Sequence, residues 1–170
     1  GYGIPGYHPR FCSWTLVDPR LVLSAALCLR AMVADQVSVS FDSVYRPGVS
    51  TIIPGLGIAA VDPARFRGEN GGGAQYGNSD LRNDIAVVHL QRAPQGITPA
   101  SLPPAGYLSS LPLDAQAFTA VGYGRIKADK TAGPNNIDPN FDPDYRNAAT
   151  VGFRNLQDAV LNLDENPAKG

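Results

Sequence analysis

The sequence has few charges and few residues of the reactive types. Only 17% of its 170 residues are charged, and the net charge at pH 7 is −1. A balance so close to zero provides no basic surface for nucleic acid or for an anionic membrane. Two histidines and two cysteines are present, at spacings that match no recognised zinc site. We therefore expect no nucleic-acid partner, no metal and no cofactor.

Long apolar runs are also missing. None approaches the roughly 20 residues that a membrane-spanning helix needs, so we expect no membrane partner. Residues 1–6 have neither the basic start nor the apolar stretch of a signal peptide. These observations indicate a chain that is either cytoplasmic or a mature part of a secreted protein.

What the sequence does have is turn-forming residues and enough apolar residues for a core. Gly 18 and Pro 15 stand beside an apolar content of 44%, which favours short strands joined by turns. The pattern predicts an all-β protein with strands at residues 11–17, 21–24, 36–41, 50–53, 57–61, 85–90, 117–124 and 148–153.

Helix is expected only in short pieces. Residues 25–32 suit one or two helical turns. Residues 155–163 place Leu156, Val160 and Leu163 at helical spacing, which predicts one amphipathic helix. The glycine-rich residues 68–80 are expected to form an exposed loop.

Two motifs suggest ligands that their surroundings exclude. Residues 55–60 fit G-x-G-x-x-A, but a dinucleotide site needs a helix that begins there, and Pro63 would interrupt it. Residues 138–144 alternate oxygen donors like a calcium loop. However, Pro143 occupies the position that requires glycine, and Ala149 occupies the position of the final glutamate. We interpret this stretch as a solvated acidic loop.

The two cysteines are Cys12 and Cys28. From their number alone, either a disulfide or two buried free thiols is consistent with the sequence. A disulfide over a loop of this length would contribute roughly 3 kcal/mol.

Four segments carry a resemblance to a known family. Residues 22–28, Val-Leu-Ser-Ala-Ala-Leu-Cys, are similar to its Trp-Val-Leu-Thr-Ala-Ala-His-Cys, and residues 83–90 to its Asn-Asp-Ile-Ala-Leu-Leu-Arg-Leu. Residues 11–16 are similar to its Phe-Cys-Gly-Gly-Ser-Leu, and residues 117–124 to its strand that ends Gly-Trp-Gly. In their order along the chain, the four segments resemble those of the trypsin-like, chymotrypsin-fold serine proteases, most of all bacterial secreted members.

The resemblance implies a double β-barrel fold. It implies a nearly complete first barrel at residues 1–93, a connection at residues 94–116 and an incomplete second barrel at residues 117–170, which includes the short helix. It also implies a Cys12–Cys28 disulfide, an extracellular location and a polypeptide substrate or protein partner. Some members bind calcium, and the acidic residues near the glycine-rich loop are then the candidates: Asp62, Glu69 and Asp80.

Proteolysis by this family needs a hydroxyl nucleophile, an imidazole base and a buried carboxylate. The resemblance makes Asp84 the carboxylate of this triad. Leu27 stands at the position of the histidine, and leucine carries no exchangeable proton. By position, neither His8 nor His89 replaces that base. In strand alternation, His89 faces away from Asp84.

Two further departures from the family pattern weaken the expectation of activity. The segment Gly-Asp-Ser-Gly-Gly-Pro, which carries the nucleophile, does not occur in the 170 residues, and Trp14 replaces a glycine near the active site. We therefore expect a serine endopeptidase domain that is inactive as given. The alternatives are a pseudoprotease that acts as a protein-binding module, with a possible partner chain or further segment, and a fragment without function.

Overall fold

A computed structural model describes residues 12–29, 32–60, 84–123, 145–157 and 160–164, apart from the side chains of Leu27 and Ala60. The chain divides into two compact units, Gly1–Leu102 and Pro103–Gly170. The boundary falls within the residues that the sequence suggests as a connection. Each unit is described by itself.

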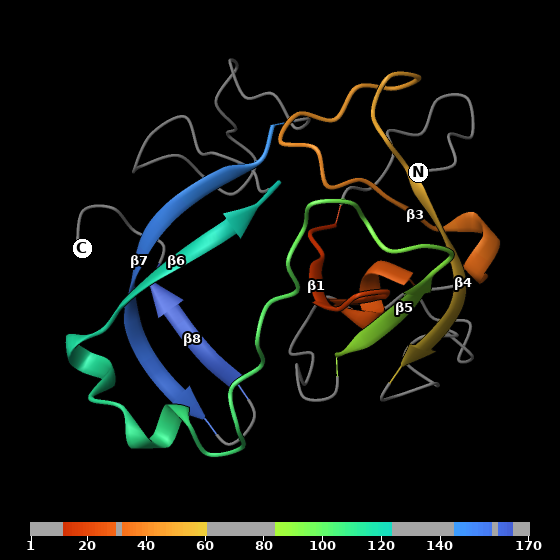
Figure 1. Cartoon of the computed structure of the whole chain (residues 1–170). Helices are drawn as coiled ribbons and strands as arrows, with labels where there is room; N and C mark the ends of the chain where they lie inside the picture. The colour runs from red at the N-terminus through yellow and green to blue at the C-terminus, as the bar shows by residue number, and fades with distance from the viewer. Residues whose placement is uncertain (1–11, 30–31, 61–83, 124–144, 158–159, 165–170) are drawn as a thin grey trace, which may run out of the picture. The chain divides into compact units, whose positions relative to one another are not determined.

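The first unit is built on a five-stranded antiparallel sheet, which curls around its own apolar face (Figure 1). Its order is β1 (Thr15–Asp18), β2 (Leu21–Ser24), β5 (Ala86–Leu90), β4 (Ile53–Ala60) and β3 (Ser38–Val39). Two short 3₁₀ helices, η1 (Ala26–Leu29) and η2 (Ala34–Gln36), lie between β2 and β3 in the chain. Four of the six predicted strands of this unit correspond to one observed strand each, and the two predicted at residues 50–53 and 57–61 both overlap β4.

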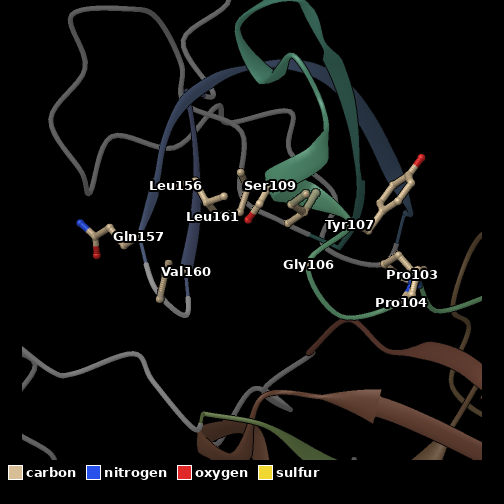
Figure 2. Close-up of a pocket in the computed structure, with 10 residues that line it drawn as sticks. Pro103, Pro104, Gly106, Tyr107, Ser109, Leu156, Gln157, Val160 and Leu161 are labelled. Atoms are coloured by element: carbon tan, nitrogen blue, oxygen red, sulfur yellow. The ribbon is translucent and has the colours of Figure 1, made fainter.

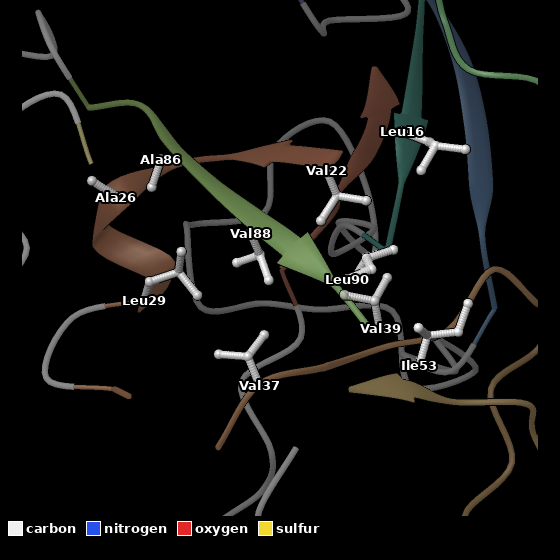
Figure 3. Close-up of a cluster of buried hydrophobic side chains, with 10 residues drawn as sticks. All are labelled: Leu16, Val22, Ala26, Leu29, Val37, Val39, Ile53, Ala86, Val88 and Leu90. Carbon is white, nitrogen blue, oxygen red and sulfur yellow. The ribbon is translucent and has the colours of Figure 1, made fainter. Parts of the chain in front are cut away.

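Strand β5 forms the centre of the core because its side chains alternate between the two faces of the sheet. Ala86, Val88 and Leu90 are buried, whereas His89 is exposed between them. Figure 3 shows how these side chains meet those of the neighbouring elements. Within the described part of the chain, the cluster consists of Leu16, Val22, Ala26, Leu29, Val37, Val39, Ile53, Ala86, Val88 and Leu90.

Strand β4 is continuous where the sequence predicts two strands with a turn or a bulge at Pro54 and Gly55 between them. Its register against β5 shifts between Gly55 and Gly57, which is the geometry of a β-bulge. A Cβ atom at Gly55 would lie 2.9 Å from the carbonyl oxygen of Ala34 and 2.9 Å from Cγ1 of Val88. Only glycine permits this close approach. Residues 55–60 are therefore strand, and no helix begins there as a dinucleotide site would require.

The second unit contains a three-stranded antiparallel sheet of order β6 (Ala117–Gly122), β7 (Asn147–Gln157) and β8 (Val160–Asp164). Two single-turn 3₁₀ helices, η3 (Leu108–Ser110) and η4 (Leu113–Ala115), precede it in the chain. Among the described residues of this unit, only Leu113 and Val151 are buried apolar residues. The described part of this unit therefore contains far fewer buried apolar residues than that of the first.

The helix predicted at residues 155–163 is wrong. Leu156 lies in β7 and Leu163 lies in β8. The two strands form a hairpin in which Gln157 pairs with Val160. The hairpin supplies β7 with a backbone partner that a helix could not provide. Asn162 Nδ2 also donates a hydrogen bond of 2.6 Å to Asn155 Oδ1 across the pair.

A β-bulge in β7 decides which apolar residues share one face of this sheet. The register of β7 against β8 shifts between Phe153 and Asn155, and the extra residue brings Leu156 onto the face of Phe153. Two apolar residues three positions apart thus share one face of a strand. The strand register places six large apolar residues on this face: Phe118, Val151, Phe153, Leu156, Leu161 and Leu163.

The protein is therefore all-β, as the sequence predicts. Its described residues contain strands and 3₁₀ turns but no α-helix. Within that part of the chain, no helix has the length and apolar character that crossing a membrane requires.

Candidate active site

The candidate site begins with a disulfide that fixes the segment after β2. Cys12 and Cys28 form this bond, with their Cα atoms 6.1 Å apart. It ties η1 to the chain immediately before β1. Close by in the chain, the Ser24 hydroxyl donates a hydrogen bond of 3.0 Å to the carbonyl oxygen of Ser13. The expected disulfide is present, and two links thus hold the end of β2 to the N-terminal segment.

Position 27 lies inside η1, between residues that are firmly held. Ala26 and Leu29 are completely buried in the core, and the backbone N–H of Cys28 donates to the carbonyl oxygen of Ala25 at 3.1 Å. The sequence folds this way because small Ala26 fits beneath the turn and Leu29 fills the core. The backbone of position 27 is therefore fixed on both sides, although the side chain of Leu27 lies outside the described part.

Asp84 reaches the same end of the sheet from another direction. Strand β5 begins at Ala86, which pairs with Ser24, the last residue of β2. Because the two strands are antiparallel, the residues that follow Ser24 and those that precede Ala86 leave the sheet at one end. Position 27 comes three residues after this pair, and the half-buried Asp84 comes two before it. The fold therefore brings both segments to the same end of the sheet.

Two other residues singled out in the sequence have clear positions. Trp14 is half-buried and packs against the core cluster of the first unit. His89 is exposed on β5, where it pairs with Leu21 and Gly57. Because Ala86, Val88 and Leu90 face the core, His89 points to the opposite face of the sheet.

The remaining candidates cannot be placed. His8, the acidic residues Asp62, Glu69 and Asp80, and residues 138–144 all lie outside the described residues. Within the described ranges, no group of three or more His, Cys, Asp or Glu residues could hold a metal ion.

The second unit contains a pocket of about 670 Å³ (Figure 2). One wall is the end of the β7–β8 hairpin, which contributes Leu156 and Leu161, and the other is the segment from Pro103 to Ser109. Neither wall contributes a carboxylate, an imidazole or a basic group. Apart from the hydroxyls of Tyr107 and Ser109 and the amide of Gln157, the lining side chains have no polar group. The pocket supplies shape and not acid–base chemistry.

Comparison with solved structures finds a similar fold in proteins that include two proteases. The secreted serine protease VesC from Vibrio cholerae matches 85% of this chain with a TM-score of 0.56 and 19% identity. The protease VesB from Vibrio cholerae matches 85% with a TM-score of 0.55 and 23% identity. The structure of GrC matches 89% with a TM-score of 0.57 and 18% identity.

The fold is the chymotrypsin fold. This identification fits the all-β architecture and the two sheets described above. The chain spans only 26%, 36% and 56% of the lengths of VesC, VesB and GrC. No protein-family model matches the sequence, and no curated protein does. The comparisons therefore show the fold, and the activity has to be argued from the residues.

Proposed function

We propose that this chain is a trypsin-like serine endopeptidase domain that does not hydrolyse peptide bonds by itself. One observation carries the proposal: a leucine occupies position 27, the place of the family's histidine, on a scaffold that otherwise retains its disulfide and its acidic residue. In a chymotrypsin-like site, Asp84 is the carboxylate that would orient the imidazole and stabilise its positive charge.

The chemical consequence of the leucine is severe. Peptide hydrolysis requires a base that accepts the proton of the serine hydroxyl and then delivers it to the leaving amine. Leucine performs neither transfer. In one serine protease, removal of the histidine alone lowers kcat by about 10⁶-fold. The chain also contains no Gly-Asp-Ser-Gly-Gly-Pro segment to provide the nucleophile.

The partners and the location are inferred from the disulfide and from the solved structures. The solved structures that this chain resembles include a secreted protease, and disulfides persist in oxidising compartments. We therefore infer an extracellular protein that binds polypeptides, either as substrates or as partners.

A peptidase assay tests this proposal directly. The purified 170-residue chain is incubated with casein and with a chromogenic peptide ester, with and without a serine-directed phosphonate. We expect no turnover above the buffer blank. Turnover that the phosphonate abolishes would overturn the proposal, because it would show an active nucleophile and base within this chain.

The second candidate function is a protein-binding pseudoprotease. The intact anchoring of η1 favours it, since Ala26, Leu29 and the disulfide preserve the local fold even though the base is missing. A binding module must be stable on its own. A cooperative thermal melt of a monomer, followed by circular dichroism and light scattering, would support this function, and a non-cooperative melt of an aggregating chain would exclude it.

A further inference from the structure

We propose that a pocket in the first unit binds an apolar side chain from an acidic segment of a partner protein. The pocket lies where β3 ends, β4 begins and β5 ends, and it has a volume of about 340 Å³. The candidate active site lies at the other end of β5, where Ala86 pairs with Ser24. The two sites are therefore distinct, and this inference does not rest on position 27.

Four of the eight residues that line the pocket are apolar, and the other four are Asp42, Thr51, Arg92 and Gln95. Ile53 is only 2% exposed and belongs to the core cluster, and the half-buried ring of Phe41 packs against that cluster. Pro94 and Ile97, on the segment after β5, provide the facing wall. The volume is at the lower end of the range for ligand pockets, which is about 300–1,000 Å³. It therefore suits a single aliphatic or aromatic side chain better than a large cofactor.

Hydrogen bonds between the segments hold the pocket open. The backbone N–H of Thr51 donates to Asp42 Oδ2 at 3.1 Å, and Arg92 Nη2 donates to the carbonyl oxygen of Ile52 at 3.2 Å. The N–H of Gln91 donates to the carbonyl oxygen of Pro54 at 3.0 Å. A partner that enters a preformed pocket loses less free energy to ordering of the site.

The charges around the opening favour an acidic partner. Arg92 lines the pocket and is exposed, and Arg46 is exposed on the loop whose two ends, Asp42 and Thr51, line it. Asp42 is the single acidic lining residue, and its Oδ2 already accepts the Thr51 amide. The guanidinium of Arg92 carries five donor hydrogens, of which the Ile52 carbonyl accepts one. The rim can therefore donate to carboxylates.

Exposed apolar residues beside the opening extend the contact surface. Val49 is 78% exposed, Ile52 48% and Ile97 41%. Apolar side chains near a pocket with a charged rim are the usual arrangement of a protein interface, in which one buried anchor supplies most of the affinity. This surface fits a polypeptide segment with one bulky apolar residue between acidic residues.

Titration of the isotope-labelled chain with synthetic peptides, followed by NMR, tests the proposal. The probe is acetyl-Glu-Glu-Leu-Glu-Glu-amide. One control peptide replaces the leucine by serine, and the other replaces the glutamates by lysines. We expect the probe to shift amide signals of residues 41–53 and 91–97, with weaker binding at higher salt. Equal binding of the serine or lysine peptide would overturn the proposal, and so would the absence of shifts at millimolar probe.

Matched variants separate binding at the pocket from general attraction. Arg92→Glu should weaken probe binding about tenfold, because charge-assisted hydrogen bonds are lost, and Ile97→Ala should weaken it about threefold through lost apolar contact. Arg154→Glu, which makes the same charge change on exposed β7, should leave binding within about twofold. Unchanged binding in Arg92→Glu, or equal loss in both arginine variants, would contradict the proposal.

Discussion

Ser24, the last residue of β2, is the antiparallel partner of Ala86, the first residue of β5. This single pair determines the geometry of the candidate active site. The segment that contains position 27 leaves the sheet after Ser24, and the segment that contains Asp84 enters it before Ala86. Residues far apart in the sequence thereby lie on segments that leave the sheet at the same end.

The first prediction tests that geometry without the need for catalysis. In the Leu27→His variant, an imidazole beside the Asp84 carboxylate should have a raised pKa, because a nearby negative charge favours the protonated form. Adding Asp84→Asn should lower that pKa by about one unit. NMR titration measures both values, with signals of His8 and His89 assigned from the parent chain. Identical pKa values in the two variants would show that the groups do not meet.

The second prediction concerns Gly55. In Gly55→Ala, the added methyl group would meet the Ala34 carbonyl oxygen and Val88 Cγ1, both at 2.9 Å. Overpacking of this kind lowers the free energy of unfolding by about 1–3 kcal/mol. The matched control is Gly57→Ala, since a Cβ atom there would meet nothing within 4 Å. Urea denaturation should separate the two variants, and similar midpoints would contradict the close approach at Gly55.

The third prediction concerns the disulfide. The double variant Cys12→Ala, Cys28→Ala should lower the free energy of unfolding by about 2–4 kcal/mol, because the unfolded chain loses a cross-link. Reduction of the parent chain with dithiothreitol should have a similar effect, whereas the same reagent should not alter the double variant. If the melting temperature of the parent were insensitive to reduction, the bond would have no structural role.

The fourth prediction compares two leucines of the first sheet. Leu90 is completely buried and Leu56 is 53% exposed. Leu90→Ala should destabilise the chain by about 2–5 kcal/mol through loss of apolar contact and creation of a cavity. Leu56→Ala should change stability by less than about 1 kcal/mol. Guanidinium denaturation curves for both variants measure the difference, and comparable losses would mean that β4 is oriented differently.

Much of the first unit could be predicted from local patterns. β2 begins and ends at the predicted residues, and β5 differs by one residue. The nearly continuous apolar run of residues 85–90 was sufficient for β5, because a short run of this kind is typical of a buried strand. β4 was harder, since Pro54 and Gly55 fit either a turn between two strands or a bulge, and the structure contains a bulge within one strand.

The hairpin of the second unit could not be predicted in this way. Leu156 and Leu163 lie seven positions apart, which fits two turns of a helix as well as two strands. Only the register between β7 and β8, with its bulge after Phe153, decides between them. A bulge at this place changes which residues of β7 share a face.

The sequence by itself determined the class of the fold, the disulfide as an implication of its motifs, and the absence of an imidazole at position 27. These are matters of residue type and local order along the chain. The tertiary structure decided which segments lie at the same end of the sheet: those that contain position 27 and Asp84 at one end of β5, and those that contain Arg92, Phe41 and Thr51 at the other. Strand pairing joins residues that are distant in sequence, and its register depends on packing of the whole sheet, so it becomes visible only when the chain is folded.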